Sequence, residues 1–186
     1  MVAARVAWRT VSPRRGKGCC YGCSPTGWRG SEVDDRTAMG LALDEARLAS
    51  AAGEVPAGAV VVRGGEVVGR GHNRRESWGD PMAHAEMIAL AQAAARQQGW
   101  RLEGCAVYAT LEPCAMCAGA MVNARVERLV FGARDPKGGY CGSIGDLVRE
   151  PRLNHQITVC SGVLAEESSA LLRAFFRRLR SSGLFD

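Results

Sequence analysis

The chain has few aromatic residues, which make up 6% of the sequence, and it contains no apolar run long enough to span a membrane. It also lacks the apolar core of a secretory signal peptide. These absences argue against a membrane-spanning or secreted protein. With 47% hydrophobic and 23% charged residues in 186 positions, the composition favours one globular domain with its own core. We therefore expect the eight cysteines in a reducing, cytoplasmic compartment rather than in disulfides.

Acidic residues are missing from the first 31 positions of the chain. That segment is rich in Arg, Gly and Ser and has no sustained periodicity, so residues 1–32 are predicted to be a disordered extension and residues 33–186 the folded domain. An Arg-rich, acid-poor start is also typical of a transit peptide, and Cys19, Cys20 and Cys23 could bind a second metal with a ligand from elsewhere. Whether translation begins at the first methionine stays open.

The formal charge of +5 is unevenly distributed along the sequence. Six of the 24 basic residues lie in the acid-free segment, which leaves 18 basic residues against 19 acidic ones in the rest of the chain. The charge of the whole chain is therefore weak support for nucleic-acid binding, and local clusters must decide.

Two short motifs can together hold one metal ion. The tripeptide His84-Ala-Glu86 precedes the pentapeptide Pro113-Cys-Ala-Met-Cys117. Cysteines three positions apart lie on one face of a helix, so Cys114 and Cys117 can supply two thiolates to a single ion. His84 can add a neutral imidazole, which gives the three protein ligands of a catalytic zinc site with an open fourth position. Two thiolates and one imidazole favour zinc over hard cations.

Glu86 is placed to move protons beside that ion. Residues two apart point to opposite sides of a regular helix, so His84 and Glu86 can face one ion only where a helix begins. Asp80-Pro81 is a signal for such a start, and Pro113 favours another. Zinc deaminases combine His-x-Glu with Pro-Cys-x-x-Cys and use the glutamate as acid and base, not as a ligand. The two motifs together predict a zinc-dependent deaminase.

Periodicity and turn residues predict alternating helices and strands, in an α/β fold. A mixed, mostly parallel sheet of about five strands should carry helices on both faces, which makes three α/β/α layers. Gly64-Gly65 fits the two-residue turn of a β-hairpin, and Trp78 and Trp100 are expected to pack inside. Predicted helices cover residues 34–51, 82–98, a segment opening near Pro113, and 164–179; predicted strands cover 59–62, 66–69, 106–111, 127–132 and 157–160.

Beyond the metal motifs, the chain resembles the bacterial tRNA-specific adenosine deaminases of the cytidine deaminase-like superfamily. The resemblance runs from about Val33 to Leu184. It is carried by segments on both sides of His84-Ala-Glu86, namely Glu54-Val-Pro-Ala-Gly-Ala-Val60, Asn73-Arg74, residues 110–121, Phe131-Gly-Ala-Arg-Asp135, Asn154-His155 and Phe175-Phe176.

This resemblance implies a cytidine deaminase-like fold and hydrolytic deamination of the wobble adenosine of a tRNA anticodon to inosine by a homodimer. It implies that His84, Cys114 and Cys117 bind one Zn²⁺ per subunit and that Glu86 moves the protons. The partner is then the tRNA anticodon stem-loop, and no membrane is involved. The residues implied to contact the substrate or the RNA are Asn73, Ala85, Asp135, Lys137, Asn154, Phe175, Phe176 and Arg180.

The residues alone leave other roles open for several of these positions. Asn73 can serve as an Asx-turn residue, and Asp135 and Lys137 can be solvated residues of a glycine-rich loop. The arginines near the end of the last predicted helix can simply offset its dipole.

Two other functions share part of this pattern. A guanine, cytosine or nucleoside deaminase has the same metal motifs, but residues 135–139, Asn154-His155 and the Phe-Phe-Arg-Arg segment favour the RNA enzyme. A non-catalytic, zinc-binding RNA subunit is expected to lack the proton-carrying glutamate, whereas Glu86 is present.

Overall fold

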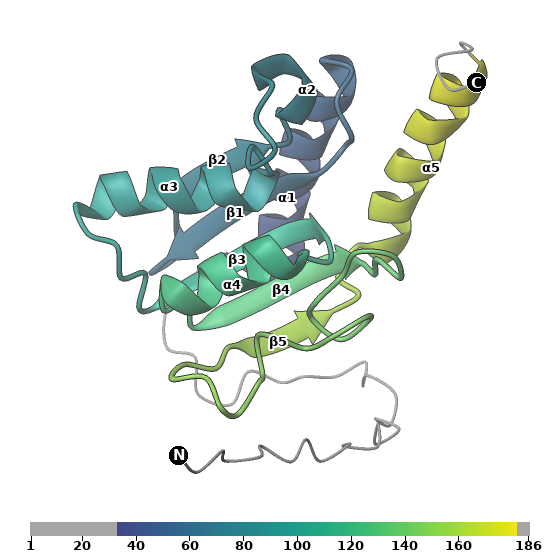
Figure 1. Cartoon of the computed structure of the whole chain (residues 1–186). Helices are drawn as coiled ribbons and strands as arrows, with labels where there is room; N and C mark the ends of the chain where they lie inside the picture. Colours follow the sequence, from purple (N-terminus) through teal and green to yellow (C-terminus); the bar gives the residue numbers. More distant parts are fainter. Residues whose placement is uncertain (1–32, 182–186) are drawn as a thin grey trace, which may run out of the picture.

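The computed structural model describes residues 33–181 (Figure 1). The proposed extension, residues 1–32, and its three cysteines lie outside this part of the chain. The elements follow one another as α1 (Asp35–Ala51), β1 (Gly58–Arg63), β2 (Glu66–His72), α2 (Arg75–Trp78), α3 (Ala85–Gln97), β3 (Cys105–Leu111), α4 (Ala115–Asn123), β4 (Arg128–Ala133), β5 (Thr158–Ser161) and α5 (Ala165–Ser181).

The five strands form one mixed sheet in the order β2-β1-β3-β4-β5. β1 is antiparallel to both β2 and β3, whereas β3, β4 and β5 are parallel to one another. Gly64 and Gly65 form the turn between β1 and β2 with positive φ angles of 55° and 86°, which glycine adopts without strain. The predicted mixed sheet of five strands is confirmed.

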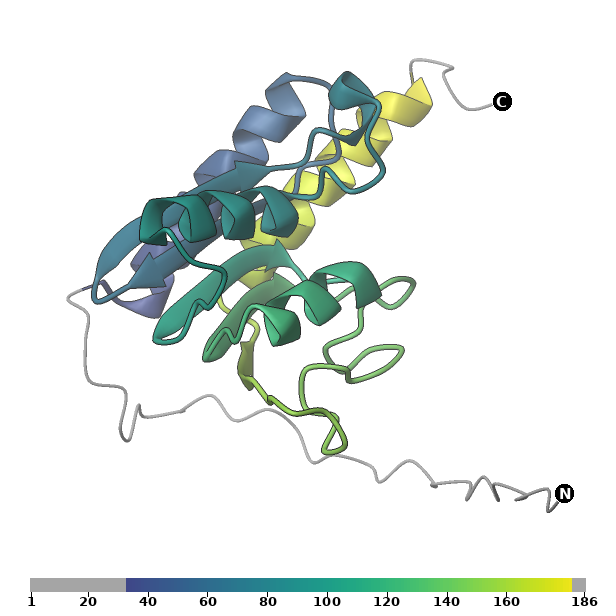
Figure 2. The same ribbon diagram turned by 60° about the vertical axis from the view of Figure 1, so that its left-hand side comes forward.

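Helices cover both faces of the sheet, as Figure 2 shows. On one face, α3 and α4 pack against side chains of the central strands, with Val107 and Phe131 in the middle. On the opposite face, α1 packs Met39 and its alanines against Val60 and Tyr108, and Leu164, next to α5, joins this cluster. The predicted α/β/α arrangement is therefore confirmed, and each face has its own apolar core.

Glycines in the hairpin strands let the helices approach closely. A Cβ at Gly58 would clash with the backbone of α1 at Ala42, and one at Gly71 would clash with the backbone of α3 at Ala85. The first turn of α3, which carries Glu86, is thus held against β2 without an intervening side chain.

The first turn of α1 is fixed to the sheet by polar contacts. Arg128, at the start of β4, donates two hydrogen bonds of 2.6 and 2.7 Å to the Asp35 carboxylate, and the Tyr108 hydroxyl donates a third of 3.0 Å. The hydrogen bonds from Arg128 hold the pKa of Asp35 below its ordinary value, although burial acts in the opposite sense.

The structure corrects several local predictions. α3 begins at Ala85 rather than at position 82, because the Asp80 side chain accepts a hydrogen bond from the Met82 amide and holds a turn there. β2 continues to His72, which pairs with Gly58. The short helix α2 was not predicted, since four residues show no periodicity.

Burial and the helix boundaries differ from the sequence predictions in two further places. Trp78 and Trp100 are more than half exposed, so their predicted packing in the core is wrong. α4 begins at Ala115, which leaves Pro113 ahead of the helix.

No helix between residues 33 and 181 is both long and apolar enough to cross a lipid bilayer.

Candidate active site

Three potential metal ligands meet where α3 and α4 begin. The Sγ atoms of Cys114 and Cys117 are 3.7 Å apart, and His84 Nδ1 lies 3.7 Å from the first and 3.5 Å from the second. Within the described residues, this is the one group of three or more His, Cys, Asp or Glu side chains arranged to hold a metal ion. The structure therefore brings together the three residues predicted as ligands.

The backbone explains how residues two and three positions apart face one point. His84 is the N-cap of α3, with an extended backbone (φ −75°, ψ 151°), and Cys114 is the N-cap of α4 (φ −72°, ψ 175°). Glu86 and Cys117 follow in the first helical turns. Both metal motifs lie at helix starts, as predicted. The extended backbone at His84 and Cys114 lets each of these residues face the same point as the later residue of its motif.

The contacts among the three potential ligands shift their pKa values in different directions. Hydrogen bonds from Cys117 and His84 lower the pKa of Cys114 to about 3, so this side chain is a thiolate at neutral pH. The hydrogen bond with Cys114 raises the pKa of His84. Contact with the Cys114 sulfur and burial together raise the pKa of the Cys117 thiol. One thiolate is thus already formed next to two groups that must lose protons before a cation binds.

Glu86 is a buried carboxyl group beside this cluster. Burial raises its pKa above the ordinary value, while its own backbone amide and the positive His84 ring oppose the shift. A carboxyl group with a raised pKa can both accept and return a proton near neutral pH. The arrangement therefore combines three side chains that could hold a metal ion with one carboxyl group that can act as acid and base.

Asn73 directly follows β2 and begins the segment that leads to α3. Its side chain is also buried. Its side-chain amide donates a 3.1 Å hydrogen bond to the buried Glu54 carboxylate. The Arg74 amide donates to the Ala83 carbonyl, which closes residues 73–83 into a loop that ends at His84. We call this segment the Asn73 loop.

A second loop, residues 134–146, follows β4, and we call it the Asp135 loop. Its backbone passes next to the metal motif: Cys114 and Gly139 form an isolated β-bridge, and the Tyr140 amide donates to the Pro113 carbonyl. The loop presents Asp135 and Lys137, and the Asp135 carboxylate accepts a 2.9 Å hydrogen bond from the Lys137 amide.

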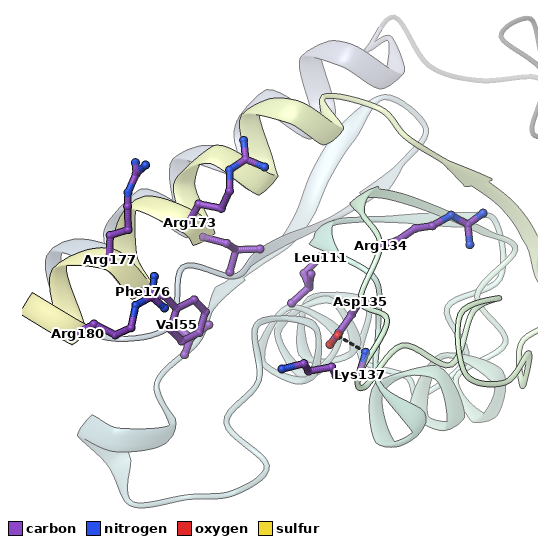
Figure 3. Close-up of a pocket in the computed structure, with 10 residues that line it drawn as sticks. Val55, Leu111, Arg134, Asp135, Lys137, Arg173, Phe176, Arg177 and Arg180 are labelled. Carbon is purple, nitrogen blue, oxygen red and sulfur yellow. Dashed lines mark hydrogen bonds between the residues drawn. The ribbon is translucent and has the colours of Figure 1, made fainter. Parts of the chain in front are cut away.

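A groove of about 760 Å³ lies between α5 and the Asp135 loop (Figure 3). We call it the α5 groove. Five basic side chains and one acidic side chain line it, together with Phe176, whose side chain is exposed. Leu111, at the end of β3 and three positions before Cys114, forms part of the wall. The lining residues are Val55, Leu111, Arg134, Asp135, Lys137, Leu172, Arg173, Phe176, Arg177 and Arg180.

Two residues singled out in the sequence lie apart from this groove. Phe175 is buried and meets Phe176 edge to face at 5.4 Å between ring centres, so only Phe176 of this pair lines the groove. Asn154 precedes β5, and its backbone and side-chain oxygens accept hydrogen bonds of 2.9 and 3.0 Å from Arg125. The structure thus engages Asn154 with the turn before β4 and does not bring it to the groove.

Several residues that line the groove or lie behind its loops were not singled out from the sequence. Arg173 lies four positions before Arg177 and seven before Arg180, a spacing that puts all three on one helix face. Glu54 and Glu112 were quoted only as parts of longer motifs, although each is a carboxylate in an otherwise apolar segment. That contrast was the available signal for a buried polar role.

Comparison with known proteins agrees with the geometry of the site. A family model described as MafB19-like deaminase matches residues 33–180. The tRNA-specific adenosine deaminase of Bacillus subtilis (strain 168) is 53% identical over 148 residues, which cover 80% of this chain and 92% of the relative. The chain belongs to the tRNA-specific adenosine deaminases. Another of these deaminases, from Aquifex aeolicus (strain VF5), is 45% identical over 142 residues, or 76% of this chain and 93% of the relative.

Solved structures extend the comparison. One comes from biochemical and structural studies of A-to-I editing by tRNA:A34 deaminases at the wobble position of transfer RNA; it shares 44% identity with a TM-score of 0.70 and covers 73% of this chain and 98% of its own. A guanine deaminase from Nitrosomonas europaea has a TM-score of 0.68 at 25% identity and covers 88% of this chain and 98% of its own. This chain therefore shares its fold with both proteins, and its sequence identity is higher to the tRNA:A34 deaminase than to the guanine deaminase.

Proposed function

We propose that this chain catalyses the hydrolytic deamination of adenosine to inosine at the wobble position of a tRNA anticodon. Zn²⁺ is the proposed cofactor, one per subunit, with His84, Cys114 and Cys117 as its ligands and Glu86 as acid and base. The observation that carries the proposal is the buried Glu86 carboxyl beside three converging ligand atoms. Membership of the tRNA-specific adenosine deaminases supports the choice of substrate.

The donor atoms fit zinc. Tetrahedral bonds of about 2.3 Å to sulfur and about 2.0 Å to nitrogen put the ligand atoms roughly 3.5 to 3.8 Å apart. The distances between His84 Nδ1 and the two Sγ atoms, 3.5 and 3.7 Å, lie in that range. When bound, Zn²⁺ acts as a Lewis acid that lowers the pKa of water from roughly 15.7 to about 7.

Glu86 carries the protons of the reaction. It accepts one proton from the attacking water as a C–O bond forms at C6 of the purine, and it passes that proton to the ring nitrogen N1. It then takes the second proton from the new hydroxyl group at C6, which becomes the carbonyl of inosine, and passes it to the leaving amine. The C–N bond breaks, ammonia leaves, and the carboxylate returns to its starting state. Burial of Glu86 suits this exchange because it raises the pKa of the carboxyl group and so favours proton uptake.

The α5 groove is the proposed site for the RNA strand next to the target base. Bases of a single-stranded anticodon loop can be splayed out into a pocket, which a duplex does not allow without unstacking. Arg177 and Arg180 suit phosphate groups, and the exposed ring of Phe176 suits base stacking. Asp135 and Lys137 lie on the opposite wall and suit the neighbouring nucleotides.

Two groups near the metal ligands are proposed to contact the adenosine itself. The side-chain oxygen of Asn73 is the proposed contact to its base or sugar, since the amide nitrogen is already used by Glu54. Ala85, between the first metal ligand and Glu86, is proposed to offer a backbone group to the base edge. Asn154 and Phe175 remain proposed RNA contacts on family resemblance alone.

We also propose a homodimer in the cytoplasm. α4 contains no charged residue, although Ala115 is exposed and Met116, Gly119 and Ala120 are only partly buried. An uncharged helix at the surface favours cover by a second subunit. Sedimentation equilibrium at micromolar concentration tests this: a mass of one subunit at every concentration would contradict it. The cytoplasmic location rests on tRNA as the proposed substrate.

The function is tested by incubating the purified protein with a tRNA pool and, separately, with adenosine, guanine and cytosine. Sequencing reports inosine, and an ammonia assay reports turnover of the small substrates. We expect inosine at an anticodon wobble position and no ammonia from the free compounds. Ammonia from guanine with unchanged tRNA would instead identify a free-base deaminase with the same metal chemistry.

A further inference from the structure

Two loops border the metal ligands, and each surrounds one buried carboxylate from elsewhere in the fold. We infer that Glu54 and Glu112 are positioning residues, which fasten the Asn73 loop and the Asp135 loop, respectively, through bonds to main-chain amides. Both side chains are almost fully buried, with 1% and 2% exposed. Neither forms a salt bridge among the ion pairs of the described residues.

Glu54 lies between α1 and β1, and its carboxylate accepts hydrogen bonds from residues 73, 76 and 77 of the Asn73 loop. Its Oε1 accepts a 2.7 Å hydrogen bond from the Ser77 amide, and its Oε2 accepts bonds from the Glu76 amide at 3.2 Å and the Asn73 side chain at 3.1 Å. Burial opposes the charge, but the bonds from Ser77 and Glu76 and the positive Arg74 outweigh it and lower the pKa of Glu54. The carboxylate is therefore charged and accepts only.

Glu112 lies at the end of β3, just before the metal motif, and the Asp135 loop wraps around it. Its Oε1 accepts hydrogen bonds from the amides of Cys141 and Ser143 at 3.1 and 3.0 Å, and its Oε2 accepts one from the Asp135 amide at 3.1 Å. The Ser143 hydroxyl donates a further bond to Oε2. A Cβ on Gly139 would clash with the Glu112 carboxyl carbon, so the loop closes too tightly for any larger residue.

The two fastenings have separate consequences for the site. Glu54 holds Asn73, the proposed contact to the adenosine, whereas Glu112 holds Asp135, whose loop forms one wall of the α5 groove. Neither carboxylate is among the residues that line the groove, so both act through the loops. The effect on tRNA rests on the proposed function, but the fastening itself can be measured without any substrate.

Glutamine substitutions test each fastening and serve as controls for each other. Every partner of the two carboxylates is a donor, so a glutamine in either orientation turns its own NH₂ group against an N–H or O–H donor. Trypsin cleaves after Arg74 and Arg75 in one loop and after Lys137 in the other. We expect Glu54→Gln to speed cleavage only in the Asn73 loop, and Glu112→Gln only in the Asp135 loop, each by about tenfold or more.

Two further measurements keep the inference testable if a glutamine variant does not fold. Gly139→Ala leaves Glu112 intact but forces the loop away from it, and we expect the same faster cleavage after Lys137. In the unmodified protein, the amides of Ser77 and Ser143 should exchange hydrogen at least about tenfold more slowly than unprotected amides. Exchange at the unprotected rate, or equal cleavage of both loops in both glutamine variants, would overturn the inference.

Activity and metal content complete the test. We expect both glutamine variants to keep the zinc content of the unmodified protein. Glu112→Gln should raise KM for tRNA by about tenfold with little change in kcat, because the loop is a proposed contact to the RNA and not to the reacting atoms. Glu150→Gln is the matched control, since that carboxylate is paired with Arg152 outside both loops and should leave both constants unchanged. Loss of zinc with unchanged loop cleavage would show a metal-site role instead.

Discussion

His84 and Cys114 occupy the last non-helical position before α3 and α4, where the backbone is still extended. At these positions the chain has not yet adopted helical geometry, so the direction of the side chain is not the one that a regular helix imposes. This residue-scale geometry explains why His-x-Glu and Cys-x-x-Cys, which could not both converge inside regular helices, surround one point here.

Glu86→Gln separates proton transfer from metal binding. The substitution keeps the size of the side chain but removes its capacity to accept a proton, so we expect kcat to fall by about 10²- to 10⁴-fold. Zinc content, measured by atomic absorption, should stay at one ion per chain. Cys117→Ser is the opposite control and should lose zinc together with activity. Loss of zinc in the glutamine variant would make Glu86 a ligand rather than an acid–base group.

At the residue scale, the sequence predicted the potential metal ligands, because their spacing is characteristic. It did not predict contacts that have no characteristic spacing. His84, Cys114 and Cys117 are brought together as expected. Nothing in the local sequence indicates that Glu54 bonds to residues 22 and 23 positions later, because these donors are main-chain amides of another segment. Likewise, only packing decides that Phe175 is buried and Phe176 is exposed.

Among the elements, α5 combines two roles on different faces. Its apolar side packs on the sheet, while Arg173, Arg177 and Arg180 line the groove. Arg178 lies on another side of the helix, where it donates a 2.8 Å hydrogen bond to the Ser50 hydroxyl of α1. The helix therefore contains both candidate phosphate contacts and a natural control for them.

Replacing both Arg177 and Arg180 with alanine should weaken tRNA binding without changing the chemistry. We expect KM to rise by about tenfold or more at physiological salt, while kcat stays close to that of the unmodified protein. The slope of log Kd against log salt concentration, measured by filter binding, should become shallower by about 0.7 for each charge removed. Arg178→Ala should change neither quantity, and an equal effect of Arg178→Ala would argue against the α5 groove as the RNA site.

The start of α1 gives a pH-dependent contribution to stability. Because the pKa of Asp35 is lowered in the folded state, its stabilising effect is present above the unfolded pKa and is lost as pH falls through the folded pKa. We expect Asp35→Asn to reduce the free energy of unfolding by about 1–3 kcal/mol at pH 7. Urea unfolding should give a smaller difference at about pH 3, below the ordinary pKa of about 3.9.

A matched variant tests whether this effect depends on the Asp35 contacts. Asp146→Asn removes a more exposed carboxylate paired with Arg149, and we expect a change of at most about 1 kcal/mol. A difference between Asp35→Asn and the unmodified protein that stayed the same at both pH values would contradict the assigned role of the charge.

For the molecule as a whole, the part of the chain that the structure describes, residues 33–181, already has an apolar core on each face of the sheet. We therefore expect removal of residues 1–32 to leave the midpoint of thermal unfolding within about 2 °C of the full chain. Wobble editing should be nearly unchanged as well. Calorimetry and the inosine assay check the two expectations, and a truncated protein with much weaker tRNA binding would assign a role to these residues.

The architecture of the whole molecule was predictable only in part. Alternating periodicity predicted the elements and the three layers, because apolar faces at helix and strand spacing must be buried. The order β2-β1-β3-β4-β5 was not predicted, since it depends on how the connections cross the sheet and not on local spacing. The α5 groove was likewise hidden, because it forms between segments that are more than twenty positions apart in the sequence.

The loops beside the metal ligands are attached to the fold chiefly through their main chain. Amides of residues 76, 77, 135, 141 and 143 meet the two buried carboxylates, and nearly every amino acid has such an amide. Side chains at the exposed loop positions can therefore be exchanged during evolution, or by an engineer, without detaching the loops. Substrate preference can therefore change while the groups around Glu86 stay the same. A combinatorial library restricted to Arg75, Trp78, Lys137 and Ile144 would vary the exposed loop side chains and leave the proposed catalytic groups unchanged.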